Sequence, residues 1–170
     1  MQLLDSDRLV EACLTFTHQL PQSSTPQKMP TTVSAAAGIV KVLVVDDSMG
    51  ARRSLIQILR PRGFELHEAG DEFDALDRLR SEHFDIVLSD LEMPRMGGFD
   101  LLAEIRSNRK TRSLPVVIVT ARGEPKNRMR ADELGSDGFL TKPVAASDLE
   151  QIFEELEVFP HADRPEGSNR

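Results

Sequence analysis

Apolar residues gather in five short runs along the chain, each bounded by polar or turn-forming residues. Uninterrupted apolar runs of this length are typical of strands that are buried on both faces of a parallel sheet. The strand-like segments are 39–45, 64–69, 86–88, 115–119 and 139–141; of these, 86–88 and 115–119 are wholly apolar, whereas Lys41 interrupts the first and charged residues interrupt the second. The pattern therefore predicts five strands.

Amphipathic stretches separate these runs, and their apolar residues recur at the spacing of one helix face. They predict helices over about 48–60, 71–80, 99–106, 126–134 and from 147 onward. Regular alternation of strands and helices predicts an α/β fold, a doubly wound parallel sheet with right-handed crossovers. The pattern alone leaves the order of the strands open.

Local signals refine three of these helices. We expect Ser48 to cap the first helix and Phe73 to lie on the inner face of the second. Ser147 and Glu150 have the spacing of a capping box, which predicts that the last helix starts there.

The ends of the chain differ in composition from its middle. Residues 1–20 contain one short amphipathic helix candidate, and residues 21–38 are rich in Pro, Ser, Thr, Gln and Ala, as flexible linkers are. We predict an N-terminal helix and linker over 1–38, one folded domain over 39–158, and a disordered polar tail over 159–170.

Charge and composition exclude several kinds of function. The formal net charge of the 170 residues is −7, which argues against a nucleic-acid-binding surface and against contact with an anionic membrane. The single cysteine excludes a disulfide framework and a thiolate zinc site. No apolar run is long enough to span a membrane, and no export signal is evident, so we expect a cytoplasmic protein.

Four of the predicted strands end in residues that carry chemistry. Asp46 and Asp47 follow the first strand, Asp90 the third, Thr120 the fourth and Lys142 the fifth. The carboxyl ends of parallel strands share one edge of the sheet, where ligands bind in open α/β folds. We therefore expect these side chains to converge.

Three carboxylates at one site repel each other unless a cation lies among them. A set of oxygen ligands without histidine favours Mg²⁺. A lysine and a hydroxyl beside that metal would hold a phosphoryl group and spread its transition-state charge. The residues thus predict a Mg²⁺-dependent phosphoryl site with a carboxylate nucleophile.

Four motifs resemble those of the response-regulator receiver domain of two-component signalling. They are Asp-Asp-Ser at 46–48, Asp-Leu-Glu-Met-Pro-Arg-Met-Gly-Gly at 90–98, Thr-Ala at 120–121 and Phe-Leu-Thr-Lys-Pro at 139–143. The resemblance extends over about 39–158. It implies a flavodoxin-like, five-stranded sheet in the order 2-1-3-4-5 with five surrounding helices.

The resemblance also implies a role for each acidic residue. Asp90 would accept a phosphoryl group from the phosphohistidine of a sensor kinase or phosphotransfer protein. Asp47, Asp90 and the backbone carbonyl of Glu92 would bind Mg²⁺ directly, and Asp46 would act mainly through water. Such a protein is a signalling module rather than an enzyme, although it phosphorylates itself and slowly loses the phosphoryl group.

The remaining motif residues would respond to the phosphoryl group. By the resemblance, Lys142 pairs with phosphoryl oxygens and Thr120 hydrogen-bonds one of them. Thr120 and Phe139 would form a switch, in which the Phe139 ring turns toward the core. Lys142 and Pro143 would be joined by a cis peptide bond.

Several other features narrow the function. The motifs are most similar to receivers of chemotaxis-type hybrid kinases, and no DNA-binding helix-turn-helix or ATP-binding glycine motif is present. Output is therefore expected through contact with a downstream protein.

Two alternatives stay open: an aspartyl-phosphate phosphohydrolase, and a receiver that docks without being phosphorylated. Glu92 and Arg122 are also expected to project over the mouth of the site and to pair.

Overall fold

Five parallel strands form one sheet in a computed structural model that describes residues 39–94 and 97–159. The order of the strands is β2-β1-β3-β4-β5. Their bounds are β1 Lys41–Val45, β2 Glu65–Ala69, β3 Ile86–Ser89, β4 Val116–Thr120 and β5 Gly138–Thr141. The predicted fold class and the implied strand order are confirmed.

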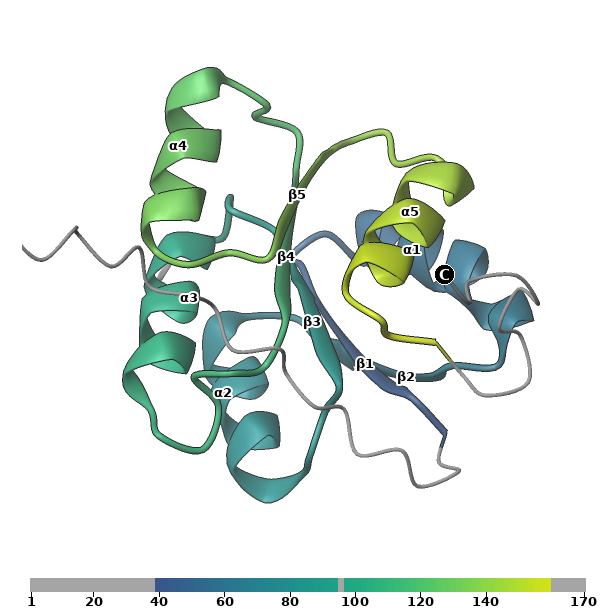
Figure 1. Cartoon of the computed structure of the whole chain (residues 1–170), viewed down its shortest axis with the longest axis horizontal. Coiled ribbons are helices and arrows are strands. Elements are labelled where there is room, and N and C mark those ends of the chain that lie inside the picture. Colours follow the sequence, from purple (N-terminus) through teal and green to yellow (C-terminus); the bar gives the residue numbers. More distant parts are fainter. Residues whose placement is uncertain (1–38, 95–96, 160–170) are drawn as a thin grey trace, which may run out of the picture. The chain divides into compact units, whose positions relative to one another are not determined.

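Helices cover both faces of this sheet (Figure 1). Helices α2, α3 and α4 lie against one face, and α1 and α5 lie against the other. Their bounds are α1 Met49–Leu59, α2 Glu72–Ser81, α3 Gly98–Ser107, α4 Pro125–Glu133 and α5 Ala146–Glu155, with a short 3-10 helix, η2, at Arg60–Arg62. Among the described residues, no helix is both long and apolar enough to cross a membrane.

Each face of the sheet supports its own apolar core. Alternate residues of β1 point to opposite sides, so that Leu43 and Val45 join one cluster while Val42 and Val44 join the other. All four side chains are almost completely buried. Burial on both faces explains why the central strands are uninterrupted apolar runs.

The register of the sheet brings the first and third strands to the same level. Val45 of β1 pairs with Ser89 of β3, and the next residues are Asp46 and Asp90. The backbone N–H of Asp90 donates to the carbonyl of Val45 at 2.9 Å. Neighbouring parallel strands therefore deliver two carboxylates to one edge of the sheet.

Two details of the predicted helices are wrong. Phe73 is 52% exposed, because the first turn of α2 buries Glu72 and Ala75 instead. Helix α5 begins at Ala146 rather than Ser147. The expected cap of Ser48 on α1 is confirmed, with Ala51 N–H donating to Ser48 Oγ at 3.4 Å.

The start of α5 depends on which side chain accepts the backbone N–H of the residue that caps the helix, Ala145. The Asp148 carboxylate accepts the N–H of Ala145 at 3.4 Å, so Asp148 takes the place expected of Glu150. Glu150 instead pairs with Arg62.

Phe159, which was expected in the tail, packs against the apolar cluster under α1 and α5. The predicted N-terminal helix and linker, and residues 160–170 of the predicted tail, lie outside the described residues.

Candidate functional site

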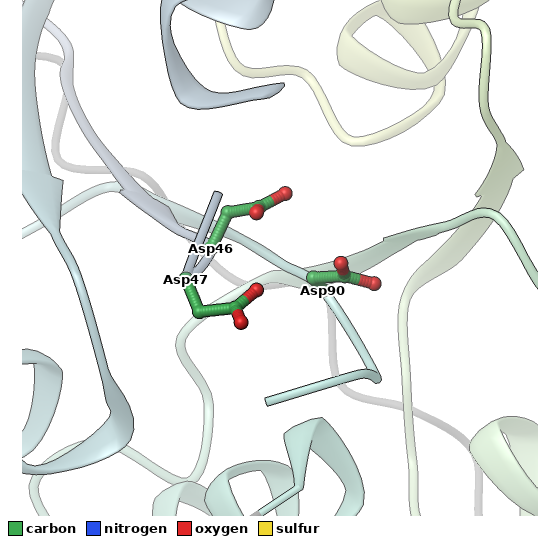
Figure 2. Close-up of side chains that lie close together, drawn as sticks. All are labelled: Asp46, Asp47 and Asp90. Carbon is green, nitrogen blue, oxygen red and sulfur yellow. The ribbon is translucent and has the colours of Figure 1, made fainter. Parts of the chain in front are cut away.

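Three carboxylates meet at the carboxyl edge of the sheet. Asp46 and Asp47 follow β1 and Asp90 follows β3; one carboxylate oxygen from each lies within 4.8 Å of the others (Figure 2). Asp46 and Asp90 are buried, at 1% and 6% exposure, whereas Asp47 is exposed. The cluster is therefore open to solvent on the side of Asp47.

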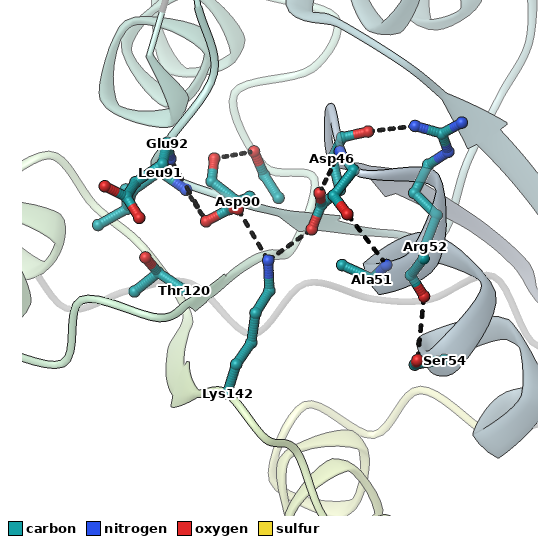
Figure 3. A network of polar contacts seen from close by, with 12 residues as sticks. Asp46, Ala51, Arg52, Ser54, Asp90, Leu91, Glu92, Thr120 and Lys142 are labelled. Atoms are coloured by element: carbon teal, nitrogen blue, oxygen red, sulfur yellow. Dashed lines mark hydrogen bonds and ion pairs between the residues drawn. The ribbon is translucent and has the colours of Figure 1, made fainter.

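Lys142 joins two of these acids. Its ammonium Nζ donates to Asp46 Oδ2 at 2.6 Å and to Asp90 Oδ2 at 2.8 Å (Figure 3). Burial by itself lowers the pKa of Lys142, but the hydrogen bonds to Asp46 and Asp90 outweigh it and raise the pKa above 10.5. The ammonium therefore stays charged at neutral pH and offsets part of the repulsion within the cluster.

The second oxygen of Asp90 is held by the loop that follows β3. Asp90 Oδ1 accepts the N–H of Leu91 at 2.7 Å and the N–H of Glu92 at 3.3 Å. The same loop passes close to the start of α3, where Gly98 N–H donates to the Leu91 carbonyl at 3.2 Å. A side chain at Gly98 would collide with the backbone of Asp90, so glycine lets α3 approach the loop closely.

Hydrogen bonds hold both the side chain and the backbone carbonyl of Asp46. Its Oδ1 accepts the N–H of Ser48 at 2.8 Å, and its Oδ2 accepts Lys142. Its carbonyl oxygen accepts a hydrogen bond from the Arg52 guanidinium (Figure 3). Both carboxylate oxygens of Asp46 are thus engaged, as are both oxygens of Asp90, whereas Asp47 is exposed.

The donor set fits a hard divalent cation. The cluster offers only oxygen atoms, and the oxygens lie close enough together to share one ion. Asp47 and Asp90 are the carboxylates that would hold it. The backbone carbonyl of Glu92, the third expected ligand, belongs to the loop that holds Asp90 Oδ1.

Thr120 and its neighbours lie at the end of β4. The Thr120 side chain is completely buried, and its Oγ1 accepts the N–H of Arg122 at 3.1 Å. Among the described residues, this hydroxyl makes no hydrogen bond to the three acids or to Lys142. Arg122 forms the expected ion pair with Glu92, Nε to Oε1.

Phe139 already lies in the core. Its ring belongs to the cluster under α2, α3 and α4 and is 7% exposed. The Arg128 guanidinium of α4 lies 5.5 Å from the ring centroid, and Arg128 Nη2 donates to the Phe139 carbonyl at 3.4 Å. The Phe139 ring therefore lies in the core beneath α4 in this structure. The Lys142–Pro143 bond is cis.

Sequence reasoning missed Arg52. Its guanidinium reaches Asp46 and also donates from Nε to Glu68 Oε2 of β2 at 3.1 Å. The sequence shows two adjacent arginines, Arg52 and Arg53, and nothing in it distinguishes them. Only the rotation of α1 about its axis, as the helix packs on the sheet, turns Arg52 toward the site and leaves Arg53 exposed.

Comparison with known proteins agrees with this geometry. The family model of the response regulator receiver domain matches residues 42–154. The chain is 38% identical over 122 residues to chemotaxis protein CheY-3 of Vibrio cholerae serotype O1, covering 69% of this chain and 94% of that protein.

Solved structures show the same relationship. The structure of Vibrio cholerae chemotaxis protein CheY4 has a TM-score of 0.66 at 28% identity, covering 70% of this chain and 99% of that one. A CheY-like response regulator receiver domain protein from Methanospirillum hungatei JF-1 has a TM-score of 0.65 at 30% identity, covering 71% and 95%.

Proposed function

Because this chain belongs to the response regulator receiver domain family of two-component signalling, we propose that it accepts a phosphoryl group on Asp90 from a phosphohistidine of a partner protein. Receiver domains are signalling modules rather than enzymes that turn over a substrate. The partner would be a sensor histidine kinase or a phosphotransfer protein.

One observation carries the assignment of Asp90. The Lys142 ammonium lies 2.8 Å from Asp90 Oδ2 and 2.6 Å from Asp46 Oδ2, at the open acidic cluster. A cation so close to the carboxylate is placed to contact oxygens of a phosphoryl group bonded to it. Asp46 and Asp90 both contact this cation, and of the two only Asp90 follows β3, the middle strand of the sheet.

The reaction proposed is a transfer between two nucleophiles. An Asp90 oxygen attacks the phosphorus and forms a P–O bond, giving an acyl phosphate. The P–N bond of the phosphohistidine breaks, its electron pair stays on the imidazole nitrogen, and that nitrogen takes up a proton. Lys142 would pair with the phosphoryl oxygens, and the Thr120 hydroxyl would donate to one of them.

Asp47, Asp90 and the Glu92 carbonyl would hold Mg²⁺, with Asp46 acting mainly through water. When bound, Mg²⁺ neutralises charge on the phosphoryl oxygens and on the carboxylates. The support for this is the set of closely spaced oxygen donors, of which Asp47 alone is exposed.

Output would occur through protein contacts. Relatives of the chain include proteins named for chemotaxis, which supports a role in a chemotaxis-type system. Phosphorylation would change the surface near Thr120 and Phe139, and a downstream protein would bind one form of that surface more tightly.

The test is an intact-mass measurement of the full chain after incubation with acetyl phosphate and Mg²⁺. Wild type should gain the mass of one phosphoryl group, and Asp90→Asn should gain none. Labelling of both proteins would overturn the assignment of Asp90. Absence of labelling in wild type would favour the docking-only receiver, and steady phosphate release from many substrates would favour a hydrolase.

A parallel measurement tests the metal. Asp47→Ala should lose Mg²⁺ binding and labelling together, because Asp47 is the exposed ligand of the cluster. Tyrosine and tryptophan are absent from the chain, so calorimetry or NMR is the suitable readout. Mg²⁺ binding and labelling equal to wild type would contradict the assignment.

A further inference from the structure

Arg52 connects three elements at the edge of the site. From α1 its guanidinium donates to the carbonyl oxygen of Asp46 after β1, and its Nε donates to Glu68 Oε2 of β2 at 3.1 Å. The side chain is only 13% exposed although it carries a full charge. A guanidinium this well buried is normally held by directional partners, as it is here.

The carbonyl that Arg52 holds belongs to the peptide group between Asp46 and Asp47. The other polar groups of Asp46 are also fixed: its N–H donates to the Ala69 carbonyl at 3.2 Å, and its carboxylate binds Ser48 N–H and Lys142. Rotation of this peptide would change the direction in which Asp47 leaves the backbone.

Asp47 has no comparable support of its own. Among the described residues its exposed carboxylate makes no hydrogen bond or ion pair. Its orientation is therefore set by the backbone from which it projects, and the Arg52 hydrogen bond is what restrains that backbone on the carbonyl side (Figure 3).

We propose that Arg52 is a positioning residue that fixes the Asp46–Asp47 peptide and thereby sets the affinity of the acidic cluster for a divalent cation. The inference rests on the proposed function, since it takes Asp47 as a metal ligand. Residues that orient a metal ligand without touching the metal commonly change affinity by about 10- to 100-fold when they are lost.

The charge of Arg52 and its proposed positioning role predict opposite changes in Mg²⁺ affinity when Arg52 is replaced. Arg52 is a cation beside a cluster that binds cations, so by charge alone its removal should tighten Mg²⁺ binding. If Arg52 acts by positioning Asp47, its removal should weaken Mg²⁺ binding. The sign of the change thus separates the two effects.

The adjacent arginine supplies a matched control. Arg53 is exposed on the same helix, and among the described residues it makes no hydrogen bond or ion pair. Arg53→Gln removes the same charge one residue away without touching Asp46. An exposed charge is screened by salt, so the Mg²⁺ affinity of Arg53→Gln should stay within about twofold of wild type.

The experiment measures Mg²⁺ affinity of the unphosphorylated full chain by calorimetry, with the midpoint of thermal unfolding recorded for every variant. Arg52→Gln should bind Mg²⁺ about tenfold more weakly than wild type. Arg52→Lys should also bind more weakly, because a single ammonium does not reproduce the guanidinium fork that reaches both Asp46 and Glu68. Glu68→Gln should have a smaller effect of the same sign.

The outcomes separate this inference from the proposed function. If wild type binds no Mg²⁺, both are wrong. If wild type binds Mg²⁺ and Arg52→Gln binds it equally or more tightly, the positioning role alone is wrong. If Arg52→Gln fails to fold, Arg52→Lys and Glu68→Gln decide, and wild-type affinity in both would overturn the inference.

Discussion

Arg122 and Glu92 form an ion pair that ties the loop after β4 to the loop after β3. Each lies two residues beyond a residue of the site, Arg122 after Thr120 and Glu92 after Asp90. Both side chains are largely exposed, at 63% and 41%, so the pair contributes only about 0–1 kcal/mol to folding. We therefore expect the pair to affect the rate at which the phosphoryl group is lost rather than the stability of the fold.

The first prediction is that this pair slows hydrolysis of the acyl phosphate by obstructing the attacking water. Glu92→Ala and Arg122→Ala should each speed loss of the phosphoryl group, and the double variant should be scarcely faster than either. Arg80→Ala breaks an exposed ion pair with Asp77 on α2 and should leave the rate unchanged. Fully additive effects of the two substitutions in a dephosphorylation time course would show that no gate exists.

The second prediction concerns the close approach of α3 to the Asp90 loop. A Cβ at Gly98 would lie 2.9 Å from the carbonyl carbon of Asp90 and 3.0 Å from the Cα of Leu91, and both neighbours are backbone atoms that yield little. Gly98→Ala should lower the free energy of unfolding by about 1–3 kcal/mol and slow labelling of Asp90.

Gly50→Ala is the matched control for that substitution. Gly50 lies in α1, and a Cβ there would meet only Ser48 Oγ at 3.9 Å. Alanine is the better helix former, so this variant should gain about 0.5–1 kcal/mol of stability. Urea titration measures both variants, and equal effects at the two glycines would contradict the role given to Gly98.

The third prediction concerns alkaline pH. Hydrogen bonds to Asp46 and Asp90 raise the pKa of Lys142 above 10.5 despite its burial, which acts in the opposite direction. A group with a raised pKa stabilises the folded state fully below its unfolded pKa and loses that contribution as pH rises through the folded pKa. The stabilisation by Lys142 should therefore be lost only above pH 10.5.

Lys142→Met measures this contribution in the absence of metal. The variant leaves two carboxylates without their cation and should lose about 1.5–3 kcal/mol at neutral pH. The difference from wild type should stay constant from neutral to mildly alkaline pH and shrink only as the pH rises above 10.5. A difference that already falls between pH 7 and 9 in urea titrations with EDTA would contradict the raised pKa.

The fourth prediction concerns the switch. Phe139 is already buried and capped by Arg128, so a phosphoryl group at Asp90 should act by drawing Thr120 and altering the contact between α4 and β5. NMR with a beryllofluoride mimic should show shifts at Thr120, Phe139 and along α4. In Phe139→Ala the shifts along α4 should disappear while those at Asp90 remain. Chemical-shift changes confined to the Asp90 loop in wild type would contradict a switch that acts through Thr120, Phe139 and α4.

Much of the architecture follows from the sequence alone. Uninterrupted apolar runs and helical periodicity predict the alternating strands and helices because both signals are local. Acids and a lysine directly after those runs predict one polar edge, since parallel strands all end on the same side. Asp46, Asp47, Asp90 and Lys142 could be assigned to one site on that basis, and the structure brings them together.

Other features were decided only by tertiary packing. The sequence does not bring Lys142 within 2.8 Å of Asp90, 52 residues away; the pairing of β3 with β4 and of β4 with β5 does. Periodicity placed Phe73 on the wrong side of α2, and it left Arg52 and Arg53 equivalent. The rotation of a helix about its axis is set by the surface on which it docks, and a shift of one residue turns it by about 100°. The sequence by itself therefore determined which residues could form the site, and the packing of helices on the sheet determined which of them reach it.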